Sequence, residues 1–244
     1  MKPGENSNQG KGISVCSKLK EIKDIIQESE YHKNNTFIIQ KYIERPALYN
    51  QRKFDIRCFG MYTLVNNKLK AYIYDNGYLR TSSRPFINSK LDNKLIHLTN
   101  DAVQKKADDY GRYETGNKLS FSEYQTYLNQ KHGDLNIDFR SHLFSQMKQI
   151  ITDTFRAGSK LVAPSRDLNH HTFEIFGYDF MLDEDFKVYL IEVNTNPCLE
   201  TTCPILQKII TDMVDCGFRI AIDPLYPPPN LKKRMNSQMS VMQW

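Results

Sequence analysis

Apolar residues recur at helical spacing in some parts of the chain and at strand spacing in others. In the last helical stretch, Pro204 falls in the first turn and Gly217 directly after the final turn, positions that suit these two residues. Helical spacing predicts helices over residues 17–28, 120–131, 141–160 and 204–216. Continuous or alternating apolar runs predict strands over residues 36–43, 53–65, 68–74, 173–182 and 187–193. Grouped strands with helices between them predict an α+β or mixed α/β fold.

Turn residues join these strands into hairpins. Asn66-Asn67 separates the second and third strands, and Asp183-Glu184-Asp185 separates the last two, so both pairs are predicted to be antiparallel. A further turn is expected at Asn76-Gly77. Residues 81–119 are rich in Asn, Asp, Ser and Gly and are expected to form mostly loop. A loop of this length inside a globular chain is usually functional or disordered.

The two ends of the chain differ from its middle. From Pro224 the sequence is rich in proline and then basic and polar, which predicts one domain over residues 1–222 and a tail over residues 223–244. The chain passes from Met1-Lys2-Pro3-Gly4 directly into a loop of glycine, asparagine and serine. We therefore expect a domain that is incomplete at its N-terminus.

Composition narrows the class of protein. Of the 244 residues, 40% are apolar, with 13 Phe and 14 Tyr, which is enough to bury a large core. The net charge of +5 is compatible with an acidic partner or nucleotide phosphates, and equally with an ordinary mixed surface. Five cysteines without a C-x-x-C pair predict reduced, buried thiols and neither a disulfide framework nor a zinc site. No apolar run reaches the roughly 18 residues that a membrane span needs, and we expect no signal peptide.

Alternating charges mark one face of the strand KFDIRC. Lys53, Asp55 and Arg57 share this face because side chains alternate along a strand, and the residues between them place the other face in a core. Three charges on one face indicate either a polar site or a solvated outer surface with ion pairs between strands. The pattern alone leaves both interpretations open.

The last hairpin is expected to bring oxygen ligands together. We expect Leu182 to pair with Lys187. This register places Asp179 and Glu192 one diagonal step apart on one face, which Asn194 continues. Two carboxylates and an amide oxygen on a rigid ribbon suit Mg²⁺, which binds hard oxygen ligands and substrate phosphates. Without a cation the carboxylates would repel each other, so either a metal ion or Lys and Arg partners must compensate.

Two further segments carry candidate anion-binding residues. Gly10-Lys11-Gly12 combines a positive charge with glycines, whose backbone can approach phosphate oxygens closely, although the spacing is not that of a Walker A loop. Arg80 lies in the run YLRTSS, where a guanidinium beside hydroxyl groups could hold a carboxylate bidentately. Each signal is weak by itself, since glycine loops are mostly turns. We expect the nearby Arg84 to be an exposed loop residue.

Eight segments in order give a far more specific signal than any one of them. From residue 2 to about residue 222, the sequence resembles the tubulin–tyrosine ligase family of ATP-grasp enzymes. The matching segments are Lys2-Pro3 with NQGKGI, then IIQKYIERP, RKFDIR, YLRTSS, HLTN, YGRYETGN, FGYDFML and KVYLIEVN. The resemblance implies an ATP-grasp fold, with a further domain and the opening strands of the ATP clamp placed before this part of the sequence.

The resemblance also implies roles for individual residues. The loop of residues 10–13 would cover the ATP phosphates, and residues 40–43 would form the hinge beside adenine. The residues implied to bind the nucleotide are Lys2, Gly10, Lys11, Gly12, Gln40, Lys41, Tyr42, Ile43, Lys53, Asp55, Thr99 and Asn100. Those implied to hold Mg²⁺ are Asp179, Glu192 and Asn194. Those implied to lie near the reacting carboxylate or the amino acid are Arg57, Arg80 and Lys105.

The implied reaction joins an amino acid to a carboxylate in two steps. The carboxylate attacks the γ-phosphate of ATP to give an acyl-phosphate, and an amino group then displaces phosphate and leaves an amide. The implied partners are the acidic C-terminal tail of tubulin and a free amino acid, with no nucleic acid or membrane, in the cytoplasm, at the cytoskeleton or in the cilium.

Two other functions fit the same sequence. One is a catalytically inactive tubulin-binding module, and the other is an ATP-grasp ligase that acts on a small-molecule acid. The amino acid added also stays open. Asp101 and Ala102 stand where polyglutamylating members carry Tyr-Ser, while RKFDIR and YGRYETGN are more like the tyrosine-adding member.

Overall fold

A computed structural model describes residues 1–4, 10–28, 36–162, 171–229 and 239–241. The chain divides into two compact units. The first unit contains residues 1–54, 80–117 and 183–185, and the second contains residues 55–79, 118–182 and 186–244.

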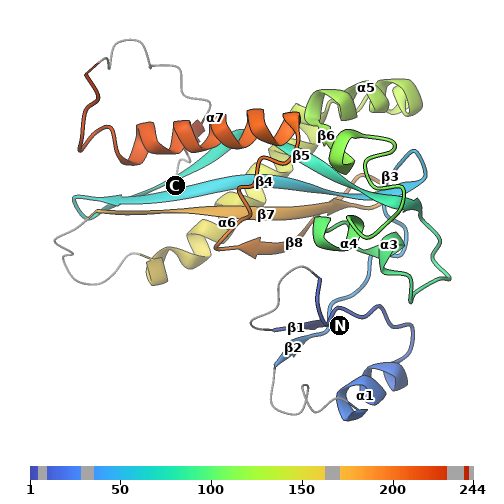
Figure 1. Ribbon diagram of the computed structural model, residues 1–244. Coiled ribbons are helices and arrows are strands. Elements are labelled where there is room, and N and C mark those ends of the chain that lie inside the picture. The colour runs from blue at the N-terminus through green and yellow to red at the C-terminus, as the bar shows by residue number, and fades with distance from the viewer. Residues whose placement is uncertain (5–9, 29–35, 163–170, 230–238, 242–244) are drawn as a thin grey trace. The chain divides into compact units, whose positions relative to one another are not determined.

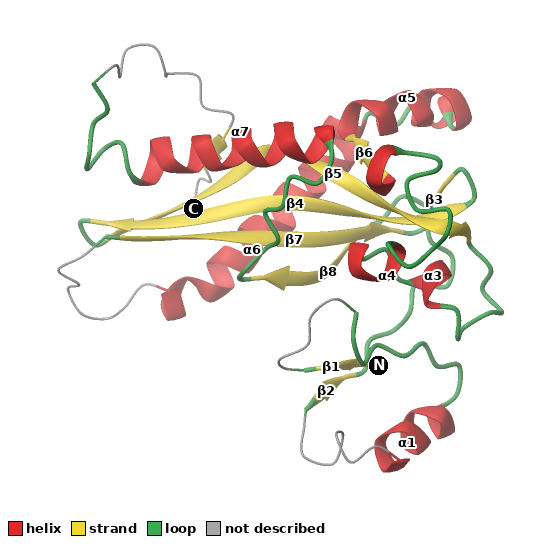
Figure 2. Cartoon of the chain, viewed as in Figure 1, coloured by secondary structure: helices red, strands yellow, loops and turns green. Residues whose placement is uncertain are grey.

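Helices and strands alternate irregularly along the chain (Figure 1 and Figure 2), which confirms the expected mixture of α and β structure. The helices are α1 Leu19–Glu28, α3 Lys94–His97, α4 Asp101–Gln104, α5 Phe121–Lys131, α6 Ser145–Val162 and α7 Pro204–Ala221. A π-helical turn, Phe139–Phe144, precedes α6, and 3-10 turns occupy Thr115–Asn117 and Gly133–Leu135. The strands are β1 Lys2–Pro3, β2 Phe37–Ile38, β3 Leu48–Tyr49, β4 Arg52–Val65, β5 Lys68–Pro85, β6 Lys118–Ser120, β7 Thr172–Leu182, β8 Val188–Asn194 and β9 Met239–Val241.

Two long antiparallel hairpins supply most of the main sheet. In the described residues its strand order is β6-β5-β4-β7-β8, with β3 paired to β4 and β9 paired to β5. Asn66 and Asn67 have φ angles of 50° and 59° in the β4–β5 turn, as a two-residue hairpin turn with the favoured twist requires. Both predicted hairpins are therefore confirmed. β9 lies in the C-terminal segment that the sequence predicts to be a tail, and the boundary at residue 222 stays a prediction.

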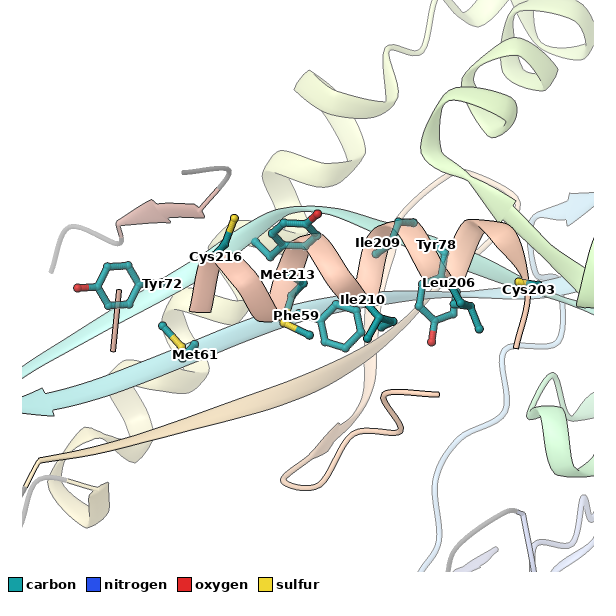
Figure 3. Close-up of a cluster of buried hydrophobic side chains, with 11 residues drawn as sticks. Phe59, Met61, Tyr72, Tyr78, Cys203, Leu206, Ile209, Ile210, Met213 and Cys216 are labelled. Carbon is teal, nitrogen blue, oxygen red and sulfur yellow. The ribbon is translucent and has the colours of Figure 1, made fainter. Parts of the chain in front are cut away.

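The second unit buries both faces of β4 against helices. Phe59 and Met61 belong to a cluster that α7 covers (Figure 3), and each fully buried side chain of this size stabilises the fold by about 1.5–3 kcal/mol. The alternate residues face α6 instead, since Cys58 Sγ lies 3.9 Å from Met147 Sδ and Gly60 lies against Phe155. The helices α6 and α7 thus cover opposite faces of the strand. None of the described helices is both long and apolar enough to cross a membrane.

Two predicted element boundaries are wrong because tertiary packing overrides the local signal. Gly217 lies inside α7 and does not end the helix, which continues to the buried Ala221, and a β-carbon at Gly217 would make only an ordinary contact with Met61 Sδ. The buried strand predicted over residues 36–43 is reduced to β2, whose partner β1 has only two residues. Ile38 and Ile39 are 47% and 59% exposed, so this apolar run is not part of a core.

Gly77 marks a close approach between strands, and the turn predicted there is wrong. β5 runs straight through Asn76 and Gly77. A β-carbon at Gly77 would overlap the backbone oxygen of Arg57 and lie 2.7 Å from Phe121 Cζ. Glycine is needed here because nothing larger fits between β4 and α5. As a result β5 continues to Pro85, and residues 81–83 lie buried in a strand instead of in the predicted loop.

We expect Gly77→Ala to lower the free energy of unfolding by at least about 2 kcal/mol, because the added methyl group must displace strand backbone. Urea unfolding monitored by circular dichroism measures the change. Gly158→Ala in α6 is the matched control. A β-carbon there meets open space, so this change is expected to raise stability by up to about 1 kcal/mol through helix propensity. Equal unfolding midpoints for wild type and Gly77→Ala would contradict the close-approach explanation.

Candidate active site

The glycine loop of the first unit is shaped by two residues with positive φ. Gly10 and Gly12 have φ angles of 71° and 73°, a region that glycine adopts without steric cost. A β-carbon at Gly12 would lie 2.6 Å from Pro3 Cγ, and one at Gly10 would lie 3.1 Å from Val103 Cγ2. The loop therefore packs tightly against β1 and α4. Residues 5–9, which the sequence places in the same loop, lie outside the described residues.

A cavity of about 400 Å³ opens beside this loop, within the first unit. Its lining includes Lys11 of the loop together with Lys94 and Lys106, against one acidic residue, Asp92. Several ammonium groups around one cavity favour an anionic ligand such as phosphate. Lys94 and Lys106 are absent from the residues predicted from the sequence, because only the fold brings them beside residue 11.

The structure brings together two residues predicted to bind the nucleotide, Tyr42 and Lys53. Lys53 is 5% exposed, and its ammonium group lies 3.2 Å from the Tyr42 hydroxyl and 4.5 Å from the centre of the Tyr42 ring. The same ammonium donates to the carbonyl oxygen of His97 at 2.9 Å. Among the neighbouring residues predicted for the hinge, Gln40 and Lys41 are exposed and Ile43 is half-buried.

The remaining predicted residues of the first unit are more dispersed. Thr99 is buried, and Asn100 is the N-cap of α4, where its side chain accepts a hydrogen bond from the Ala102 amide at 2.9 Å. Lys105 is exposed at the other end of the same helix. Lys2 lies in β1 opposite Ile38. Their contacts with a nucleotide stay predictions.

The charged face of β4 is buried, which rules out the solvated-surface interpretation. Asp55 is 8% exposed and Arg57 is 5% exposed. In the second unit, Arg57 donates to Asp179 through Nε at 2.5 Å and through Nη2 at 3.1 Å, a bidentate ion pair. Arg80, predicted to face a carboxylate or the amino acid, is buried in the part of β5 that belongs to the first unit.

The register of the last hairpin differs from the predicted one. Leu182 pairs with Val188 instead of Lys187, and a β-bulge follows between Asp179 and Phe180. The bulge adds one residue to β8, so Asp179 lies directly opposite Glu192, where the sequence predicts a diagonal relation. The two carboxylates are therefore on one face, as predicted, and closer in register than predicted.

The donor set at this hairpin fits a magnesium ion. Asn194 is opposite Gly177, and its Nδ2 atom lies 3.5 Å from Asp179 Oδ2, so Asp179, Glu192 and Asn194 gather at one end of the ribbon. No group of three or more His, Cys, Asp and Glu side chains in the described residues is arranged to hold a metal ion. Mg²⁺ needs only one or two carboxylates, because waters and substrate phosphates complete its octahedron. Arg57 supplies the basic partner that the alternative interpretation requires, so the ion pair offsets part of the negative charge.

A protein-family model described as the tubulin-tyrosine ligase family matches residues 1–233. The chain belongs to the tubulin–tyrosine ligase family. The mixed fold agrees with the ATP-grasp architecture expected for that family.

Curated relatives in this family carry names that refer to tubulin. "Probable alpha-tubulin polyglutamylase Ttll1" from Tetrahymena thermophila is 30% identical over 91% of this chain and 53% of its own length. "Tubulin glycylase 3D" from the same organism is 32% identical over 88% of this chain and 20% of its own length. "Probable tubulin polyglutamylase TTLL9" from Bos taurus is 32% identical over 82% of this chain and 48% of its own length. The chain thus spans at most about half the length of these relatives.

The tubulin–tyrosine ligase family segment YGRYETGN has a structural role that the sequence analysis missed. Glu114 forms a bidentate ion pair with Arg52, and the Thr81 hydroxyl donates to the same carboxylate at 2.9 Å. Asn117 donates through Nδ2 to the Thr81 carbonyl at 3.0 Å and to Ser83 Oγ at 2.9 Å. The segment therefore holds the strand that carries Arg80 in place. The only sequence signal was the joint presence of YGRYETGN, RKFDIR and YLRTSS.

The cysteines agree with the prediction of free thiols, but two of them depart from the predicted burial, since Cys16 is half-buried and Cys198 is exposed. All five are unpaired with one another, and Cys58, Cys203 and Cys216 are buried. Burial raises the pKa of the Cys58 thiol well above its ordinary value, and the nearby Asp179 carboxylate adds to the shift.

Proposed function

We propose that the chain acts as an ATP- and magnesium-dependent ligase that joins an amino acid to a carboxylate of a tubulin tail. The observation that carries the proposal is the pair of Asp179 and Glu192 at one register position, with Asn194 beside them and Arg57 bound to Asp179. Family membership and the names of the tubulin-modifying relatives support the substrate class.

The ribbon of β7 and β8 would hold the metal. Asp179 and Glu192 would bind Mg²⁺ through carboxylate oxygens and Asn194 through its amide oxygen. When bound, Mg²⁺ supplies positive charge to the transferring phosphoryl group. Asp179 fixes the guanidinium of Arg57 through two hydrogen bonds, so this cation is oriented before an acidic substrate arrives.

The first unit would hold the nucleotide. The backbone of Gly10 and Gly12 can approach phosphate oxygens because neither residue carries a β-carbon, and Lys11 adds a point charge. Lys53 is held in one place by two oxygen atoms, the Tyr42 hydroxyl and the His97 carbonyl. These residues mainly position the reactants and stabilise charge, as phosphoryl transfer requires.

The proposed reaction proceeds in two steps. A carboxylate oxygen of the acceptor bonds to the γ-phosphorus of ATP, and ADP leaves. The amino nitrogen of the incoming free amino acid then bonds to the activated carboxyl carbon, phosphate leaves, and the nitrogen loses a proton as the amide forms. Arg57, Arg80 and Lys105 are proposed to offset the repulsion between the acidic acceptor and the nucleotide phosphates. The site of action proposed is the cytoplasm, at the cytoskeleton or in the cilium.

Mass spectrometry of tubulin-tail peptides tests the proposal. The full chain is incubated with the peptides, ATP, Mg²⁺ and isotopically labelled tyrosine, glutamate or glycine in separate reactions. We expect a mass increase of one amino acid residue with one of the three, and none when ATP is omitted or Mg²⁺ is chelated. Peptide binding without label transfer would favour an inactive tubulin-binding module, and labelling of a free acid alone would favour a small-molecule ligase.

A further inference from the structure

A chain of partly buried polar contacts leads through the first unit to Lys53. The Nε2 atom of His97 lies 2.8 Å from the carbonyl oxygen of Lys90, and its Nδ1 atom lies 2.7 Å from the Tyr42 hydroxyl. The same hydroxyl lies 3.2 Å from the Lys53 ammonium nitrogen. The His97 side chain is 2% exposed and therefore has little access to water as an alternative partner.

The chemistry of the two ends fixes the direction of every hydrogen bond between them. A carbonyl oxygen only accepts, so Nε2 of His97 carries a hydrogen and donates to Lys90. In the neutral ring Nδ1 must then accept, so the Tyr42 hydroxyl donates to it. The Tyr42 oxygen in turn accepts a hydrogen bond from the Lys53 ammonium, which only donates. All four groups are matched only when His97 is neutral.

The surroundings of His97 favour this neutral state. Burial lowers the pKa of His97 below its ordinary value of 6.5, and Lys53 lowers it further, while the hydrogen bond to the Lys90 carbonyl and the Asp92 carboxylate oppose the shift. Lys94 lines the same small cavity as His97, and the Phe86 and His97 rings form a T-shaped pair with centroids 5.9 Å apart. Burial also raises the pKa of the Tyr42 phenol, so this hydroxyl keeps its proton.

We propose that His97 and Tyr42 are positioning residues that orient the Lys53 ammonium toward a nucleotide, and that protonation of His97 releases this orientation. The inference rests on the proposed function, in which Lys53 contacts the nucleotide. A second proton on His97 turns Nδ1 into a donor, so the Tyr42 hydroxyl loses its acceptor and must turn its hydrogen elsewhere. The oxygen then no longer faces Lys53 in the same way, and a second positive charge lies close to the ammonium group.

The sign of the pH effect follows from the direction of the shift. In the folded protein His97 is neutral above 6.5 and stays neutral somewhat below that value, because its folded pKa is lowered. Nucleotide affinity is therefore expected to be full near neutral pH and to fall as the pH drops through the folded pKa of His97.

Calorimetric titration of the full chain with ATP and Mg²⁺ between about pH 7.5 and pH 5.5 tests the inference. His97→Asn keeps an acceptor near the Nδ1 position and does not titrate. His97→Phe keeps a ring and removes both nitrogens, and Tyr42→Phe removes the oxygen that links His97 to Lys53. His171→Gln, at an exposed position, is the control. Because protonation of the nucleotide affects wild type and variants alike, its effect drops out of the ratio of their affinities at each pH.

At about pH 7.5 we expect His97→Asn to bind within about threefold of wild type, and His97→Phe and Tyr42→Phe to bind about tenfold more weakly. As the pH falls toward about 5.5, wild type and His171→Gln are expected to lose affinity progressively relative to His97→Asn, by less than about tenfold because the folded pKa of His97 is lowered. Circular dichroism checks that each variant is folded. If His97→Phe does not fold, the comparison of Tyr42→Phe with His97→Asn still tests the inference.

Two negative results have different meanings. If wild type, His97→Asn and Tyr42→Phe bind the nucleotide equally well and with parallel pH profiles, the positioning role is wrong. That result would leave the proposed ligase function intact. The absence of any magnesium-dependent nucleotide binding by wild type would overturn both.

Discussion

Glu192→Gln is expected to lower the rate of ATP-dependent amino acid transfer by at least about 100-fold while the chain stays folded. Glu192 is exposed at a register position opposite Asp179, so the change removes a charge and keeps the size of the side chain. The remaining donors, one carboxylate and one amide, bind a hard dication far more weakly. Transfer rates measured over a range of Mg²⁺ concentrations check this result, and high Mg²⁺ is expected to restore part of the activity.

The control for this variant is Glu174→Gln on the same hairpin. Glu174 lies near the start of β7, on the opposite face of the strand from Asp179 because side chains alternate, and it accepts a hydrogen bond from the Tyr62 hydroxyl at 3.2 Å. The Glu174 carboxylate belongs to no proposed metal site. The transfer rate of Glu174→Gln is therefore expected to stay within about twofold of wild type. Equal rates for Glu192→Gln and Glu174→Gln would remove the metal role assigned to the ribbon.

Glu114→Ala is expected to lower the free energy of unfolding by about 3–5 kcal/mol, because it leaves Arg52 buried without its counter-charge. The side chains of Arg52 and Glu114 are 4% and 9% exposed, so water cannot replace the lost partner. The Thr81 hydroxyl loses its acceptor at the same time. Guanidinium unfolding monitored by circular dichroism measures the loss.

Two comparisons separate burial from charge in this prediction. Glu184→Ala removes one partner of the Arg45–Glu184 ion pair, whose side chains are 76% and 44% exposed, and is expected to cost less than about 1 kcal/mol. Arg52→Met combined with Glu114→Ala is expected to be more stable than Glu114→Ala alone, since no unpaired charge stays buried. If Glu114→Ala and Glu184→Ala are equally destabilising, the network around YGRYETGN does not hold the strand in the way inferred.

Local patterns were sufficient for the elements whose periodicity is uninterrupted. The hairpin turn at Asn66 and Asn67 follows from residues that tolerate positive φ between two apolar strands. The face of α7 follows from helical spacing, and the shared face of Asp179, Glu192 and Asn194 follows from alternation along two strands. These signals depend only on neighbours along the chain or on one hairpin.

Glycine residues gave the least reliable predictions of where an element ends, because local rules do not take tertiary packing into account. Gly77 and Gly217 suggest a turn and a helix end by local rules, yet each lies inside a regular element, and at Gly77 a neighbouring strand leaves no room for a β-carbon. The bulge at Asp179 could not be predicted from the sequence either. Alternation tells which side chains share one face of a strand, but it does not reveal an extra residue in the partner strand.

The sequence by itself determined the hairpins, the apolar helix faces, the shared face of the three proposed metal ligands and, through eight ordered segments, the family. Only the tertiary structure decided that the charged face of β4 is buried, that Arg57 binds Asp179, and that Glu114 binds Arg52. The physical reason is that periodicity records which way a side chain points, whereas burial and ion pairing depend on which distant segment lies opposite it.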